Sequence, residues 1–135
     1  MNEPIIEFKD EKHAYECLEE WQRRLYLSDW IIRVSFEKID KDRAAEIYTE
    51  HSQKSAKIRF NILTPERKES EPVRYCAEKI MVHELLHILF DIVRYDQSSL
   101  AENELELAQH IKTEFMARSL IMVKYDLDPD WFKNI

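Results

Sequence analysis

The stretch from Val73 to about Val93 constrains the fold of this chain more than any other segment. Its apolar residues are too dense to form a single stripe, so we expect a helix that is buried on most sides. Pro72 is suited to open that helix, because proline is common in a first helical turn. The apolar positions are Ile80, Val82, Leu85, Leu86, Leu89, Phe90 and Val93. A central helix of this kind requires the other elements to pack around it.

The residues before this stretch predict one helix and three strands. From about Glu11 to Leu27, apolar side chains recur every three or four positions, which indicates an amphipathic helix. Residues 30–39 and 56–62 alternate apolar and polar side chains, as strands with one buried face do, and residues 44–50 are a weaker strand candidate. Because the connections are short, we expect the three strands to form an antiparallel meander.

Two further segments complete the expected fold. The charged run from Glu66 to Glu71 is interpreted as an exposed loop, and Leu100 to about Val123 as a last long helix. The fold class is therefore α+β within one domain, residues 1–135. Its elements are an N-terminal helix, a three-stranded mainly antiparallel sheet, the central helix and a C-terminal helix.

Composition excludes several classes of function. The chain has 20 basic and 27 acidic side chains and a net charge of -7, which argues against a broad nucleic-acid surface. It contains 0 glycines, so glycine-rich phosphate loops and dinucleotide fingerprints are absent. Turns and helix ends must therefore use Asn, Asp, Ser and Pro.

The cysteines and the apolar segments predict the cellular compartment of the protein. Cys17 and Cys76 are far apart and form no CxxC pair, which favours two reduced, partly buried thiols. No apolar run suggests a membrane span, and the first residues do not form a signal peptide. We therefore expect a cytoplasmic protein with no membrane partner, and the sequence leaves its oligomeric state open.

The central helix carries the motif His83-Glu84-Leu85-Leu86-His87. Histidines four positions apart lie one turn apart on the same face of a helix, so both imidazoles can face one metal ion. Glu84 can reach a water molecule on that ion. A catalytic zinc site needs a third protein ligand and an open position, so the rest of the chain must supply one more donor.

The last helix offers several third ligands. The metzincin pattern is excluded, because it would require a glycine at Phe90 and a histidine at Val93. We predict Glu104, since Leu107, Ala108, Ile111 and Phe115 follow it at helical spacing and form an apolar stripe that we expect to face the core. Glu106 and His110 remain alternatives.

Other polar residues could assist this site. Asp91 lies four residues after His87, where it could orient a histidine. Tyr95, Tyr125 and His110 are the donors available to stabilise an oxyanion, although a structural role is the simpler interpretation of each.

On these residues the chain resembles the small zincin metallopeptidases, of the gluzincin type found among phage-associated and bacterial proteins. The resemblance spans residues 25–30, the strand residues 31–34 and 56–60, the motif at 82–87 and the helix led by Glu104. It implies Zn²⁺ bound by His83, His87 and Glu104, with Glu84 as general base. The related SprT-like proteases use a later histidine as third ligand, and His110 matches that option.

The expected function is zinc-dependent hydrolysis of peptide bonds in a protein or peptide substrate. The strand at residues 56–62, if it lies at a sheet edge, could hold an extended substrate by strand addition. An alternative from another class is a zincin fold that binds metal without catalysis and serves as a latent or regulatory interaction module. The short chain motivates this alternative, because no second subdomain is evident to complete a substrate cleft.

Overall fold

The computed structural model describes residues 3–39, 42–94 and 102–134. The elements in chain order are helix α1 (Glu11–Arg24), strands β1 (Ile31–Glu37) and β2 (Ala45–Glu50), the 3-10 turn η1 (His51–Gln53), strand β3 (Ser55–Asn61), helices α2 (Pro65–Ser70), α3 (Ala77–Arg94) and α4 (Glu102–Tyr125), and the 3-10 turn η2 (Pro129–Phe132). The expected α+β fold, with helices at both ends of the chain and a three-stranded sheet, is confirmed.

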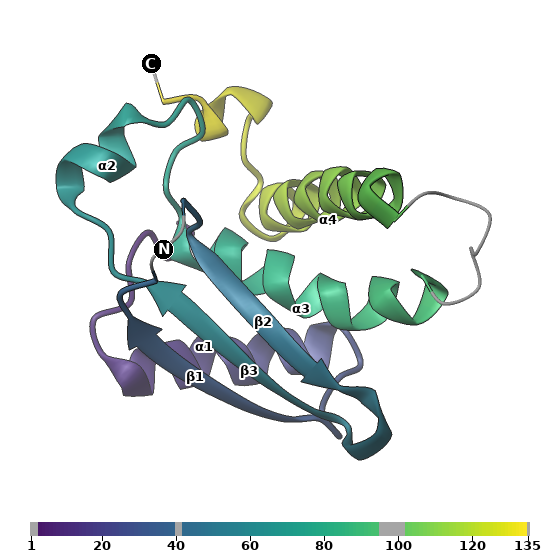
Figure 1. The fold of residues 1–135 in the computed structure, drawn as a ribbon. Helices are drawn as coiled ribbons and strands as arrows, with labels where there is room; N and C mark the ends of the chain where they lie inside the picture. The colour runs from purple at the N-terminus through teal and green to yellow at the C-terminus, as the bar shows by residue number, and fades with distance from the viewer. Residues whose placement is uncertain (1–2, 40–41, 95–101, 135) are drawn as a thin grey trace.

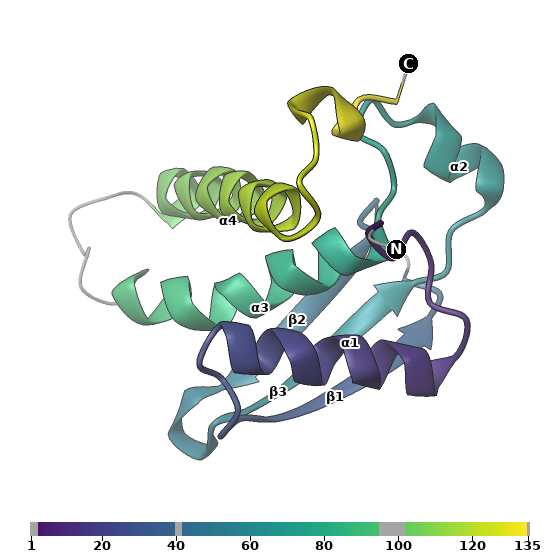
Figure 2. The ribbon, with the colours of Figure 1, turned by 180° about the vertical axis from the view of Figure 1, so that it is seen from behind.

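The layers follow from which faces are apolar. Helices α1 and α3 cover one face of the sheet, and α4 packs on α3 on the side away from the strands (Figures 1 and 2). The large side chains Trp21, Ile58, Phe60 and Leu85 are at most 1 % exposed and join the α1, β3 and α3 layers into one core. Helix α3 is therefore central, as its dense apolar sequence predicts.

The order of the strands is β1-β3-β2, and the predicted meander is wrong. Strand β1 runs parallel to β3, with Val34 opposite Ile58, and β2 runs antiparallel to β3. Strand β3 therefore lies in the middle of the sheet, and β2, which comes before it in the chain, lies at the edge opposite β1. Alternation of side chains determines which face of each strand is buried, but it carries no information on which strands are neighbours.

Residues 64–76 also differ from expectation. The charged run predicted as a loop forms helix α2, because Thr64 Oγ1 accepts a hydrogen bond from the Arg67 backbone N–H at 3.2 Å and Pro65 occupies the first turn. Pro72 does not open α3. The segment after it runs beside the C-terminal tail, where the Arg74 backbone N–H donates to the Phe132 carbonyl at 2.7 Å.

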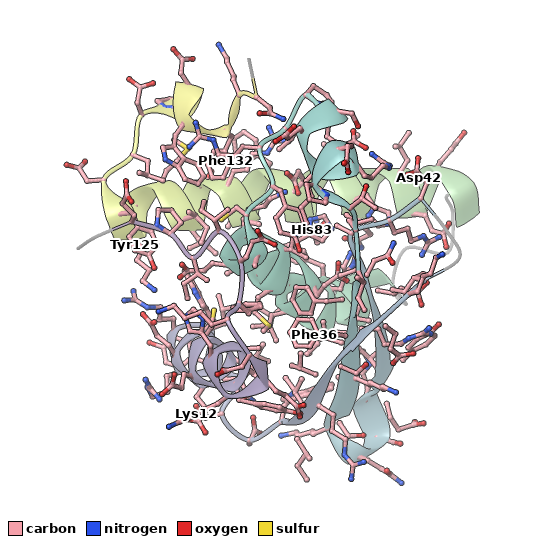
Figure 3. The ribbon with its side chains drawn as sticks, turned by 90° about the vertical axis from the view of Figure 1, so that its left-hand side faces the viewer. Lys12, Phe36, Asp42, His83, Tyr125 and Phe132 are labelled. Carbon is pink, nitrogen blue, oxygen red and sulfur yellow. The ribbon has the colours of Figure 1, made fainter. Side chains whose placement is uncertain are left out.

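The N-terminal segment supports the start of α3, and the C-terminal tail buries Phe132. The carbonyls of Ile6 and Ile5 accept the backbone N–H groups of Ala77 and Glu78 at 2.8 and 3.0 Å, so the N-terminal segment satisfies donors that open the helix. The buried Phe132 belongs to the yellow C-terminal part of the ribbon that follows α4 (Figure 3).

The absence of glycine is visible in the backbone. Tyr26, Lys54 and Asp126 adopt positive φ angles of 58°, 49° and 54° where the chain leaves α1, η1 and α4. Glycine would take this left-handed conformation without the steric penalty of a Cβ atom. Only Asp126 belongs to the residue types expected to replace glycine in turns.

Cys17 and Cys76 are free and buried, as the sequence predicts. Within the described ranges, no helix combines the length and the apolar character needed to cross a membrane.

Candidate metal centre

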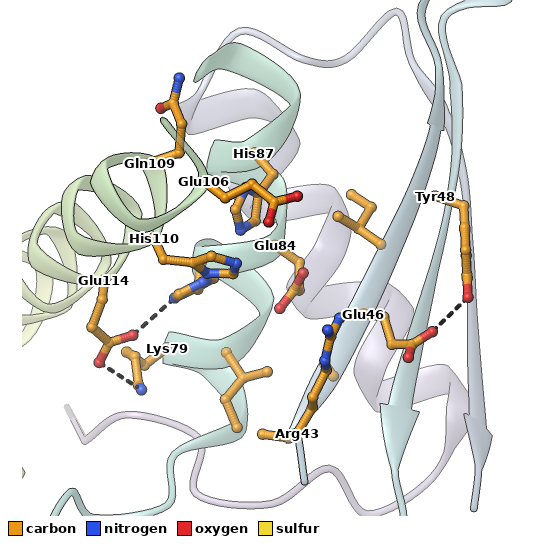
Figure 4. Close-up of a pocket in the computed structure, with 15 residues that line it drawn as sticks. Arg43, Glu46, Tyr48, Lys79, Glu84, His87, Glu106, Gln109, His110 and Glu114 are labelled. Carbon is orange, nitrogen blue, oxygen red and sulfur yellow. Dashed lines mark hydrogen bonds and ion pairs between the residues drawn. The ribbon is translucent and has the colours of Figure 1, made fainter. Parts of the chain in front are cut away.

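Three imidazoles from two helices converge beside the sheet. His83 and His87 lie on α3, and His110 lies on α4, which packs against α3. Figure 4 shows His87 and His110 beside each other at the contact of these two helices. One ring nitrogen of each residue lies within 4.8 Å of the corresponding atoms of the other two. Helical spacing brings His83 and His87 together, and the packing of α4 adds His110, one of the alternatives that the sequence left open.

The group fits a zinc ion by its chemistry. Zn–N bonds of about 2.0–2.1 Å in a tetrahedral site bring ligand nitrogens to about 3.4 Å apart, so small side-chain rotations would close the group around an ion. Three histidines are also a complete protein ligand set for a catalytic zinc, which leaves the fourth position for water or substrate.

Glu104 does not join the three imidazoles. Its side chain is exposed, and the stripe used to place it faces outward: Leu107, Ile111 and Phe115 are 62 %, 62 % and 71 % exposed. Among its described side chains, helix α4 instead buries Gln109, Thr113, Ala117 and Ile121, which are spaced four residues apart. The apolar stripe therefore identified the wrong face of the helix.

Glu114 is a site residue that the sequence analysis missed. Its Oε1 lies 2.8 Å from Nδ1 of His83, and its Oε2 accepts hydrogen bonds from Lys79 Nζ at 2.9 Å and Arg118 Nε at 2.6 Å. The bond to Nδ1 leaves Nε2 of His83 as the nitrogen that can bind a metal. The signal was the spacing of His110 and Glu114, one turn apart on the same helix face.

The charges around Glu114 keep it ionised. Burial acts to raise the pKa of its carboxyl group, but the hydrogen bonds from His83 and Lys79 and the charge of Lys79 hold that pKa well below its ordinary value. The carboxylate can therefore orient the His83 ring as an anion.

Glu84 lies beside the imidazoles and is 7 % exposed. Burial raises the pKa of its carboxyl group, while the charges of His83, His87 and Arg43 act in the opposite direction. Burial also lowers the pKa of His110, as do the charges of His87 and His83, which favours the neutral imidazole that binds metals.

A cavity of about 520 Å³ opens beside this group. Its walls come from α3, from α4 and from the start of β2, and all three histidines and Glu84 line it. The strand side is formed by residues 43–48, where the buried Glu46 accepts a hydrogen bond from the Tyr48 hydroxyl at 2.6 Å.

The other expected residues have different positions. Tyr125 donates a hydrogen bond to Glu78 Oε1 at 2.6 Å, far from the histidines in sequence and at the other end of α4, so it is structural. The Asp91 side chain and Tyr95 lie outside the described residues.

No protein-family model, no curated protein and no solved structure matches this chain. The function of the site has to be inferred from its own chemistry.

Proposed function

We propose that this protein is a zinc-dependent peptidase in which His83, His87 and His110 bind the metal and Glu84 is the general base. The observation that supports it best is the meeting of three imidazoles and a buried carboxylate on the wall of one cavity. His110 takes the role that the sequence analysis gave to Glu104, and the set then has the three-histidine form that the SprT-like resemblance implies.

A zinc ion held there would activate a water molecule and polarise the substrate carbonyl. Glu84 lines the same cavity, so its carboxylate can take a proton from the attacking water, hold it, and deliver it to the leaving amine. Glu114 holds the ring of His83 through Nδ1, which leaves Nε2 as the ring nitrogen available to the metal.

Strand β2 is the better candidate for holding an extended substrate. The sequence analysis gave this role to residues 56–62, but β3 lies between β1 and β2 and has no open edge. Among the described residues β2 pairs with β3 alone, and residues 43–48 at its start line the cavity. A peptide could pair with the open edge of β2 and present a carbonyl to the histidines.

The metal site is tested by elemental analysis of protein purified without a histidine tag or chelator. We expect one zinc ion per chain, lost in His83→Ala, His87→Ala and His110→Ala and kept in Glu104→Ala. Full zinc content in His110→Ala together with loss in Glu104→Ala would overturn the assignment of the third ligand.

The chemistry is tested by mass spectrometry of a peptide library incubated with the zinc-loaded protein. The Glu84→Gln variant should keep its zinc and cleave about 10²–10⁴ times more slowly, the usual contribution of a general base. Equal cleavage by Glu84→Gln and wild type would contradict the mechanism. Stoichiometric zinc without cleavage of any peptide would favour the alternative of a non-catalytic metal-binding module.

A further inference from the structure

A second cavity of about 300 Å³ adjoins the metal centre. The two cavities share a wall made by Arg43, Ala44, Lys79, Ile80 and Glu114. The five shared residues place the two cavities next to each other, so neighbouring residues of one extended peptide could contact both.

The lining of this second cavity is unusually basic for this chain. Six cationic side chains surround it: Arg43, Arg67, Lys68, Arg74, Lys79 and Arg118. Only three carboxylates line it with them, namely Asp42, Glu71 and Glu114. The whole chain has a net charge of -7, so this concentration of positive charge opposes the overall balance.

The carboxylates of the lining are already paired. Asp42 and Glu71 both form ion pairs with Arg67, and Glu114 binds Lys79 and Arg118. These contacts hold the walls of the cavity in place and account for three of the six cations.

The remaining cations have different surroundings. Lys68 pairs with Glu7 and lies over the Tyr75 ring at 4.4 Å. The Arg74 guanidinium lies over the Trp131 ring at 4.5 Å, which fixes it without neutralising its charge. In the part of the chain that the structure describes, neither Arg43 nor Arg74 has a carboxylate within ion-pair distance.

We infer that the second cavity binds an acidic side chain of the substrate, an aspartate or glutamate close to the bond that is cleaved. Arg43 and Arg74 supply unpaired guanidinium groups, which bind carboxylates through charge-assisted hydrogen bonds. Arg43 lies on the wall common to both cavities, next to the start of β2, so the same bound peptide can meet both. The inference rests on the proposed function and names its substrate class.

The test measures binding separately from cleavage. Two fluorescein-labelled peptides are compared: an acidic one that contains Asp and Glu, and a neutral one with Asn and Gln at the same positions. Each peptide is mixed with increasing amounts of zinc-loaded Glu84→Gln protein, and binding is followed by fluorescence anisotropy. We expect the acidic peptide to bind about tenfold more tightly, the usual effect of one charge-assisted hydrogen bond. Arg74→Gln, and more strongly the double variant with Arg43→Gln, should remove this difference. Arg33→Gln, the same change at an exposed position of β1, should preserve it.

The outcomes of this experiment test the acidic pocket separately from the proposed peptidase activity. Equal binding of both peptides overturns the acidic pocket, whether or not the wild type cleaves peptides. Tighter binding of the acidic peptide that depends on Arg74 supports it, even if no cleavage occurs and the proposed function fails. Binding of a single-stranded DNA oligonucleotide through Arg43 and Arg74, with no binding of the acidic peptide, would assign the cavity to nucleic acid and overturn the inference.

Discussion

Helix α3 carries two buried carboxylates fewer than two turns apart, and their surroundings are opposite. Glu78 is 0 % exposed and all its hydrogen-bonding capacity is used. Its donors are the Ile5 backbone N–H at 3.0 Å, the Trp21 indole at 2.8 Å, the Lys124 ammonium at 2.7 Å and the Tyr125 hydroxyl at 2.6 Å. These contacts join the N-terminal segment, α1 and α4 to the start of α3.

Glu84 has no such set of donors. Among the described residues no hydrogen bond reaches its carboxylate, which borders the cavity beside His83 and His87. Burial raises the pKa of the Glu84 carboxyl group. The Glu78 carboxylate instead accepts hydrogen bonds that join separate parts of the fold. A buried acid saturated with donors stabilises a protein, and one left open to a cavity is available to exchange a proton.

The largest effect should distinguish these two acids directly. Glu78→Gln leaves the Lys124 ammonium with Glu20 as its remaining ion-pair partner and places an amide among the buried donors of Glu78, so we expect a loss of about 3 kcal/mol in the free energy of unfolding. Glu84→Gln in the metal-free protein should lose nothing, because the amide removes a poorly solvated charge. Urea unfolding of both variants in the presence of a chelator measures the difference. Equal destabilisation would contradict the comparison.

The reactivity of the Cys17 and Cys76 thiols measures how well the region around Glu78 is buried. Burial raises the pKa of Cys76 to about 11 and also raises that of Cys17, and the charge of Glu78 adds to both shifts. At pH 8 we expect iodoacetamide to label both thiols roughly 100-fold more slowly in the native protein than in urea, since only the thiolate reacts. Labelling of Cys76 should accelerate as the pH rises toward about 11. Glu78→Gln should speed labelling, and native rates equal to those in urea would show that the region is open.

Glu114 contacts His83 in the candidate metal site, so we expect its substitution to change metal affinity more than the free energy of unfolding. Glu114→Gln weakens the hold on His83 Nδ1, and we expect zinc affinity to fall about 10–100-fold, as for other partners of metal-binding histidines. Competition with a fluorescent zinc chelator measures this affinity. Glu104→Gln removes an exposed carboxylate from the same helix and is the matched control. A similar loss in both variants would mean that overall charge is responsible.

The smallest effect concerns the outward face of α4. Phe115 is 71 % exposed, so Phe115→Ala should change the free energy of unfolding by no more than about 0.5 kcal/mol. Calorimetric melting of the two proteins measures it. A loss of several kcal/mol would show that Phe115 is buried in solution, and would restore the original prediction that this stripe faces inward.

The choice of Glu104 as third ligand failed because the stripe used to place it is on the outer face of α4. The stripe of Leu107, Ile111 and Phe115 has the spacing of a buried helix face, but it is exposed. The face that α4 turns inward contains Gln109 and Thr113, because it borders a polar site. Periodicity identifies an inner face only when that face packs against apolar surface.

The sequence alone determined the α+β class, the central position of α3 and the pairing of His83 with His87 beside Glu84. Each depends on local geometry, since residues four apart share a helix face whatever the rest of the chain does. Only the tertiary structure decided that β3 lies between β1 and β2, that His110 and Glu114 meet the motif, and that basic side chains gather beside it. Those neighbours come from segments far apart in the chain, and no spacing along one helix or strand specifies which of them meet.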